Sequence, residues 1–245
     1  MEENSKILLL ENEVIYNGKD KDAILRGIGD GKKIVLLTSY LSDKMEAKIA
    51  FVISSVLRKY DKMHLHSSIY SMMKELAVNA TKANAKKVFF NENGVENESS
   101  PKFAECVKKF KENLSEEWIQ LYGQKAKLSM LFVCIMIEHD ENGLVIKVKN
   151  TSEISETDET RLREKLRHGL KYQDLSDYYL NNMDQTEGEG IGLVLNLFVM
   201  KGENFNPGLF RIGNVNGYAV ARVEIPFTES FVSVREKYIS DKEQE

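Results

Sequence analysis

The chain has little of what marks several common classes of protein. Its 245 residues include two cysteines, Cys106 and Cys134, which form no metal-ligand cluster and fit a reducing compartment. The longest apolar run, residues 130–137, has the length of a strand and is too short to span a bilayer. The N-terminus lacks the basic start and apolar core of a signal peptide. We therefore expect a cytoplasmic protein with no membrane partner.

Positive charge and the common catalytic motifs are also scarce. Lys and Arg total 34 against 38 Asp and Glu, giving a formal net charge of −4, whereas nucleic-acid-binding surfaces usually need a basic field. The chain contains no Cys-x-x-Cys pair, no His-Glu-x-x-His helix and no Ser-His-Asp order of a known triad. We expect no nucleic-acid partner, and the 42% of hydrophobic residues is enough for a sizeable core.

Among the motifs that are present, the first is a run of alternate glycines. Gly188, Gly190 and Gly192 directly precede residues 194–200, whose apolar pattern predicts a helix. Glycines let the backbone approach a ligand closely, and the free N–H groups at the start of a helix bind anions. The segment therefore indicates a phosphate cradle, although ordinary turns between a loop and a helix have the same spacing.

A second polar motif lies upstream, on the helix predicted for residues 67–85. Glu75, Asn79 and Lys82 fall at positions i, i+4 and i+7, so they share one face, while apolar residues occupy the other. An asparagine oxygen can bind magnesium, a glutamate can orient or deprotonate a water molecule, and a lysine can neutralise phosphate charge. A solvated helix face would show the same pattern, and the motif alone leaves both interpretations open.

Together, the two segments resemble the GHKL superfamily of nucleotide-binding proteins, which includes gyrase, the ninety-kilodalton heat-shock chaperones, the histidine kinases and the mismatch-repair ATPases. The family's asparagine box, Glu-x-x-x-Asn-Ala, is matched by Glu75 and Asn79, and Lys82 matches a basic position of the histidine kinase branch. Residues 188–193 match the second glycine box, and residues 208–226 resemble the closing strand pair of histidine kinase domains.

The resemblance implies a fold, ligands and roles for these residues. The fold would be an α/β two-layer sandwich, the histidine kinase-type ATPase or Bergerat fold, whose mixed sheet is covered on one face by helices. The ligands would be ATP and Mg²⁺, with Asn79 holding the metal and Glu75 acting as the catalytic base or water-orienting group. Lys82 would lie near phosphate, and the glycine box would surround the phosphates with Gly188, Gly190, Ile191, Gly192 and Leu193.

One departure from the family pattern concerns the nucleotide base. The family's first glycine box has an aspartate that accepts a hydrogen bond from the adenine amino group, whereas this chain has Asn150 there, with no glycine after it. An asparagine oxygen can accept from the amino group of adenine, and a turned amide donates to a carbonyl such as that of guanine. ATP and GTP are therefore both candidates, as is a pocket that binds no nucleotide.

The rest of the chain divides around this motif pair. We expect residues 1–60 to form N-terminal strands and a helix that packs on the core, residues 61–226 to form the nucleotide-binding domain, and residues 227–245 to form a charged tail. Within the domain, residues 96–127 are predicted to form a helical insertion and residues 152–187 a lid over the nucleotide.

Smaller elements follow from the same patterns. Strands are predicted at residues 7–10, 13–16, 33–37, 86–90, 131–139, 144–150, 208–212 and 218–226, and a helix at 42–60. The apolar face of that helix would serve core packing or dimerisation, and we take core packing as the expectation. In the lid, Ser155 and Asp158 predict a helix cap. The lid arginines are expected to be solvated, with phosphate contact as the alternative, and the insertion to be scaffold, with partner docking as the alternative.

The activity is less defined than the fold. None of the four histidines lies in the sequence context of a phosphoacceptor histidine, so autophosphorylation is not expected. One hypothesis is an ATPase or a kinase that phosphorylates a protein partner in a signalling pathway, as the anti-sigma-factor kinases of the superfamily do. The other is a catalytically inactive interaction module with the same fold that needs no nucleotide. A homodimer is compatible with both hypotheses.

Overall fold

The sheet at the centre of the fold is antiparallel. The computed structural model describes residues 21–181 and 191–243. In these ranges five strands pair in the order β1-β2-β3-β5-β4, each antiparallel to its neighbours. They are β1 (Ile34–Thr38), β2 (Val133–His139), β3 (Gly143–Asn150), β4 (Phe210–Val215) and β5 (Tyr218–Pro226). The predicted α/β two-layer sandwich is confirmed, but the predicted mixed sheet is not found among the described strands, which are all antiparallel.

Two hairpins account for much of the antiparallel pairing. One joins β2 to β3, and the other joins β4 to β5 through Asn216 and Gly217. These two residues have φ angles of 50° and 82°, the positive values that a two-residue hairpin turn requires and that Asn-Gly adopts readily. β1 and β5 enter next to β2 and β3 in the opposite direction, so no parallel pair forms among the described strands.

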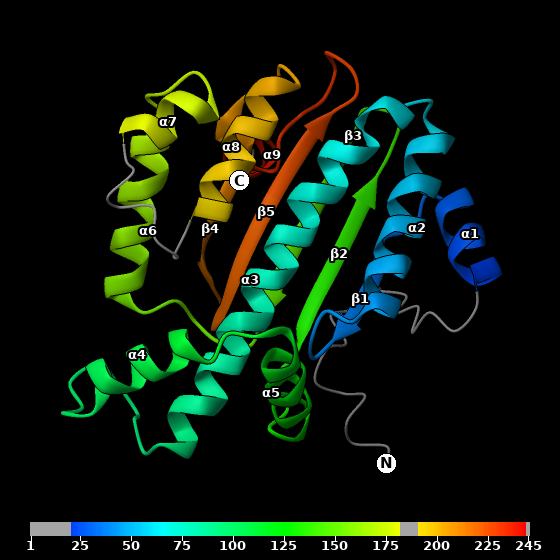
Figure 1. The fold of residues 1–245 in the computed structure, drawn as a ribbon. Coiled ribbons are helices and arrows are strands. Elements are labelled where there is room, and N and C mark those ends of the chain that lie inside the picture. The colour runs from blue at the N-terminus through cyan, green and yellow to red at the C-terminus, as the bar shows by residue number, and fades with distance from the viewer. Residues whose placement is uncertain (1–20, 182–190, 244–245) are drawn as a thin grey trace.

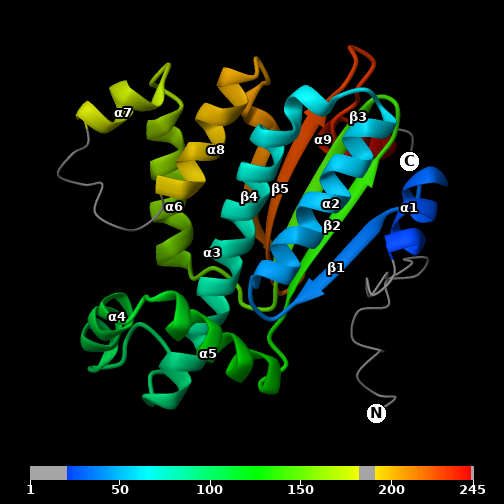
Figure 2. The ribbon, with the colours of Figure 1, turned by 45° about the vertical axis from the view of Figure 1, so that its right-hand side comes forward.

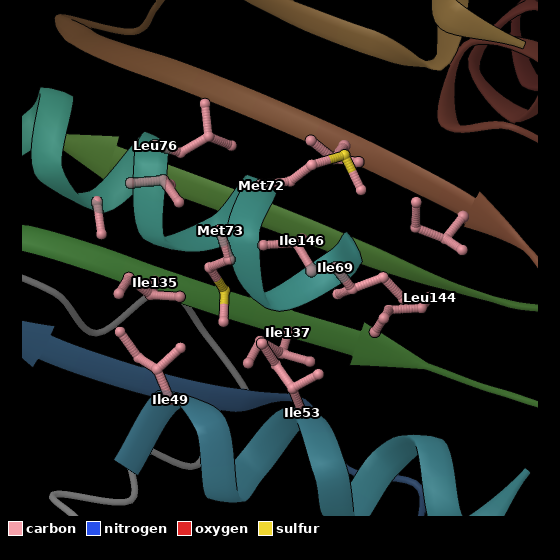
Figure 3. Packing of buried hydrophobic residues seen from close by; sticks show 14 of the residues in the cluster. Ile49, Ile53, Ile69, Met72, Met73, Leu76, Ile135, Ile137, Leu144 and Ile146 are labelled. Atoms are coloured by element: carbon pink, nitrogen blue, oxygen red, sulfur yellow. The ribbon is translucent and has the colours of Figure 1, made fainter. Parts of the chain in front are cut away.

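Helices cover one face of this sheet. α2 (Asp43–Lys59), α3 (His66–Glu92) and α8 (Ile191–Gly202) lie across it, with α3 in contact with both of the others (Figures 1 and 2). Their apolar side chains pack against the inward side chains of β2 and β3 (Figure 3). The close-up shows, among others, Ile49, Ile53, Met72, Met73, Ile135, Ile137 and Ile146. The apolar face of the helix predicted at 42–60 is therefore used in the core, as expected.

α3 is longer than the sequence predicts, which corrects one predicted strand. The helix continues to Glu92, so residues 86–90 form its last turns and do not begin the sheet. No glycine or proline interrupts the chain between residues 66 and 92. Phe89 and Phe90 are buried because the following segment packs against them. An aromatic run with the appearance of a strand is thus a helical face with a tertiary partner.

That partner is the segment predicted as a helical insertion, which forms two helices in the structure. α4 (Phe103–Glu112) and α5 (Glu116–Leu128) lie at the C-terminal end of α3 (Figure 1). Phe89 of α3 meets Phe110, Trp118 and Tyr122 with ring centroids 5.6–6.1 Å apart, distances typical of favourable aromatic pairs. This second, aromatic core attaches the insertion to α3.

The described part of the predicted lid consists of two helices. α6 (Glu156–Gly169) and α7 (Leu175–Asn181) stand beside α8 (Figure 1). Ser155 caps α6, because its hydroxyl accepts a hydrogen bond from the Asp158 N–H at 3.1 Å. The predicted cap is confirmed.

The two ends of the described chain add elements that the sequence patterns did not indicate. α1 (Lys21–Gly29) packs against α2, and α9 (Val234–Glu243) forms within the predicted charged tail. Short 3₁₀ turns occupy Met63–Leu65 and Pro207–Leu209. The strands predicted at 7–10 and 13–16 lie outside the described residues. Within residues 21–181 and 191–243, no helix is both long enough and apolar enough to cross a membrane.

Candidate functional site

A cavity of about 640 Å³ lies between α3, α6 and the sheet. Its volume falls within the range of small-molecule sites, about 300–1,000 Å³. α3 lines it from Leu76 to Asn91, which corresponds to about 22 Å of helix at 1.5 Å per residue. β3 and β5 contribute Val148 and Ala219, and the insertion contributes Phe103. The cavity is therefore long, with one wall built by α3 and another by segments far from α3 in the sequence.

Three of the predicted site residues line this cavity. They are Asn79 from the asparagine box, Asn150 from the position of the first glycine box, and Leu193 from the second glycine box. The other two residues predicted on α3 are not part of the lining. Glu75 is half-buried beside Asn79, and Lys82 is exposed. The fold thus brings the three motifs together and leaves Lys82 outside the cavity.

The glycine box is only partly within the described residues. Gly188 and Gly190 lie outside them, as does the side chain of Ile191. Gly192 is described, and it lies directly against Glu75: a Cβ at position 192 would come within 2.9 Å of the Glu75 Cγ and closer still to its carboxylate. With the Glu75 side chain in this position, only glycine fits at this point of α8.

Glu75 and Asn79 form a hydrogen-bonded pair one helical turn apart. The Asn79 Nδ2 donates to Glu75 Oε1 at 2.8 Å. The carboxylate therefore fixes the orientation of the amide, and it leaves the Asn79 oxygen as an acceptor at the cavity wall. The Asn79 oxygen is therefore the acceptor that this pair has available for a ligand.

Cations that the sequence analysis did not assign to the site also line the cavity. Lys86 and Lys87 of α3 are among them, together with Arg161 and Lys165 of α6. Lys86 stands at i+7 from Asn79, so helical spacing could have placed it on the same face. Its Nζ lies 3.6 Å from Asp158 Oδ2, an ion pair between α3 and the lid helix.

The lid arginines differ in their surroundings. Arg161 lines the cavity and lies 3.7 Å from Asp158, whereas Arg163 pairs with Glu159 at 2.7 Å on the exposed side of α6. Both side chains are about two-thirds exposed, which fits the expectation of solvated lid charge. Arg161 also lines the cavity.

The insertion and the lid are joined beside the cavity. The Ser155 hydroxyl, which caps α6, donates to Glu98 Oε1 at 2.6 Å, and both residues line the cavity. This hydrogen bond is the main cause of a lowered pKa at Glu98, which therefore stays ionised at neutral pH. The insertion is thus part of the cavity wall as well as a scaffold.

Asn150 stands at the last position of β3 and is only 4% exposed. It lies opposite Ala219 of β5 in the sheet register. Its side chain is 3.5 Å from the Asn84 Oδ1 of α3, and the Ser152 hydroxyl donates to the same oxygen at 3.3 Å. Polar groups from β3, α3 and the loop after β3 therefore meet beside the cavity, where Asn150 and Ser152 line it and Asn84 is buried behind them.

A preformed metal cage is not found in the part of the chain that the structure describes, where no three His, Cys, Asp or Glu side chains gather as metal ligands. The donor set nevertheless fits one metal. Mg²⁺ typically takes one or two protein oxygens and completes its shell with phosphate oxygens and water. The oriented oxygen of Asn79 supplies one such ligand at the cavity wall.

Comparison with known proteins identifies a distant relative and no family. The chain is 25% identical over 207 residues to an uncharacterized protein of Treponema pallidum (strain Nichols), and the match covers 84% of this chain. The chain spans 40% of the length of that relative. No protein-family model matches the chain, and no solved structure matches it.

Proposed function

We propose that the protein binds a purine nucleoside triphosphate with Mg²⁺ in the cavity along α3, and that it acts in cytoplasmic signalling with a protein partner. One observation carries the proposal: Asn79, Asn150 and Leu193 line the same cavity. Asn79 and Leu193 come from two motifs that resemble nucleotide-binding motifs of the GHKL superfamily, and Asn150 stands at the position of a third, from which the chain departs. A chance resemblance of separate segments gives no reason for them to meet at one site.

The polar groups of the cavity indicate which end would hold the phosphates and which would hold the base. Gly192 and Leu193 lie in the first turn of α8, where the backbone N–H groups of a helix favour phosphate. Asn79 lies one helical turn beyond the Glu75 that packs against Gly192. We place the phosphates at this end and the base toward Asn150. The apolar side chains of Val148 and Ala219 then offer a surface for the flat faces of a purine.

Magnesium fits the same end. The Asn79 oxygen would hold the ion together with phosphate oxygens, and the ion would neutralise phosphate charge. Glu75 holds the Asn79 amide by accepting from its nitrogen. The cavity wall carries Lys86 and Lys165 among its cations, but its cations are matched in number by carboxylates, so the proposed anionic ligand relies on the metal for charge balance.

Calorimetric titration and thermal unfolding with ATP, with and without Mg²⁺, test the proposal. A ligand at a hundred times its Kd adds about 2.7 kcal/mol to the free energy of unfolding. We expect this stabilisation for the wild type and its loss in Asn79→Ala. Asn91→Ala is the matched control, because Asn91 lines the same cavity from the same helix at the opposite end. Absence of a shift with ATP and with GTP would refute the proposal, as would an equal loss in both variants.

The position of Glu75 favours a second candidate, a binding module without hydrolysis. Its carboxylate packs against Gly192, accepts from Asn79 and does not line the cavity. A catalytic base must reach the water that it activates. Release of phosphate from ATP that stops in Glu75→Gln while binding persists would identify an ATPase. No release by the wild type, with binding intact, would identify the module.

A further inference from the structure

The amide of Asn150 faces two backbone acceptors. In the orientation that satisfies its neighbours, Nδ2 donates to the carbonyl oxygen of Ala219 at 3.3 Å and to that of Ser152 at 3.2 Å. The opposite orientation would bring the side-chain oxygen against these carbonyl oxygens, which only accept. Both hydrogens of the Asn150 amide are therefore used by the backbone of β5 and of the loop after β3.

The oxygen of Asn150 then faces Asn84 on α3. Asn84 is fully buried, and its Nδ2 has no partner when its oxygen faces Asn150. Turning the Asn84 amide together with that of Asn150 places the Asn84 nitrogen 3.5 Å from the Asn150 oxygen and 3.3 Å from the Ser152 hydroxyl. A buried N–H without a partner is rare, so the paired orientation is the favourable one.

We propose that Asn84 and Asn150 form an amide clasp, which ties α3 to β3 and β5, and that Asn150 does not discriminate between purine bases. The proposal rests on the proposed function, because it concerns the ligand class of the same site. Its consequence is that the site accepts nucleotides with a 6-amino or a 6-oxo purine. Asn150 retains no N–H for a 6-oxo group, and its oxygen is turned to Asn84 and away from a 6-amino group.

The clasp also explains why this position holds asparagine where the resembling family has aspartate. A carboxylate at position 150 would set an oxygen against the carbonyl groups of Ala219 and Ser152, and burial would oppose its charge. Thr151, the neighbouring hydroxyl of the cavity lining, both donates and accepts, so it suits either base edge. The groups around position 150 therefore favour the clasp and disfavour a charged side chain that would recognise the base.

The test combines affinity with stability. The Kd values of Mg-ATP and Mg-GTP are measured by calorimetry for the wild type and Asn150→Ala, and unfolding midpoints are measured for both and for Asn150→Asp. Asn91→Asp is the control, because it adds the same charge to the same cavity at an exposed residue. We expect the two Kd values to lie within about tenfold in the wild type, and their ratio to persist in Asn150→Ala. We expect both changes at position 150, but not Asn91→Asp, to lower the midpoint.

The outcomes separate the clasp from the proposed function. A preference for either nucleotide of more than about tenfold would overturn the base tolerance, and its loss in Asn150→Ala would assign base recognition to Asn150. A midpoint of Asn150→Asp equal to that of Asn91→Asp would overturn the clasp. Failure of the wild type to bind both nucleotides would overturn the proposed function and the base tolerance, while the unfolding comparison would still decide the clasp.

Discussion

The contact between Gly192 and Glu75 makes a sharp prediction about a single methyl group. A Cβ at position 192 would overlap the Glu75 carboxylate, and its three nearest neighbours all belong to Glu75. Gly192 is not among the glycines with positive φ, so alanine suits the backbone there. Gly192→Ala therefore perturbs one thing, the position of Glu75, and through it the hydrogen bond from Asn79.

Three contributions determine how much Gly192→Ala changes the free energy of unfolding. Overpacking of a filled site costs about 1–3 kcal/mol, and loss of the hydrogen bond costs about 1 kcal/mol. Alanine in place of glycine returns up to about 1 kcal/mol of helix propensity. We therefore expect Gly192→Ala to lower the free energy of unfolding by about 1–3 kcal/mol. Because the flexible end of the Glu75 side chain can move, the expected destabilisation is smaller than for a clash with backbone atoms.

A double-mutant cycle measured by urea unfolding tests this explanation. In the Glu75→Ala background the overlap is absent, so Gly192→Ala is expected to be neutral or stabilising there. Gly202→Ala, on the same helix, is the control because a Cβ there meets nothing within 4 Å. Equal effects of the two glycine substitutions, or a coupling energy of zero between Glu75 and Gly192, would refute the steric account.

Three further predictions concern other parts of the fold. Burial, with a smaller contribution from Lys59, lowers the pKa of His139 from 6.5 to about 4, so the unfolded chain takes up the proton first. Stability should therefore fall by up to about 3 kcal/mol as the pH drops from 6.5 to 4, and the pH dependence of thermal unfolding should flatten in His139→Gln. Phe89→Ala should lower the free energy of unfolding by about 3–5 kcal/mol. It should also shift the fluorescence of Trp118, the one tryptophan, to longer wavelength, and unchanged emission would contradict the aromatic core. Lys201→Met should lower the free energy of unfolding by about 1–3 kcal/mol, because the ammonium donates hydrogen bonds to backbone carbonyls at the end of α6. Hydrogen exchange should then speed up at that end of α6 and not in α3.

Local patterns predicted the elements whose faces are defined by nearby residues. The hairpin of β2 and β3 follows from the strand patterns on either side of Asn142 and Gly143, and α2 follows from its apolar stripe. Residues 86–90 were predicted wrongly because their partner, the insertion, comes later in the chain. α1 was missed because it is a short helix of nine residues with only two large buried side chains, Ile24 and Ile28. The mixed sheet came from the family resemblance and not from the residues.

The candidate site shows the same division between local and tertiary information. Helical spacing predicted that Glu75 and Asn79 share a face, and the 2.8 Å hydrogen bond between them follows from it. Spacing did not exclude Lys82, because only the position of α6 and the sheet decides which turn of α3 faces the cavity. The backbone carbonyls around Asn150 belong partly to β5, so the sequence of β3 carries no sign of them.

The two candidate functions differ in one physical respect, the freedom of the Glu75 carboxylate. In the structure Asn79 donates to one of its oxygens, and Gly192 leaves no space beyond it. A cation on the Asn79 oxygen would polarise that amide and strengthen its N–H donation to Glu75, since hydrogen bonds in a chain reinforce one another. Metal binding would then hold Glu75 in place instead of releasing it toward a water molecule. On this argument Glu75 is a positioning residue for Asn79, and Glu75→Gln should weaken the Mg²⁺-dependent part of nucleotide binding even in a protein that hydrolyses nothing.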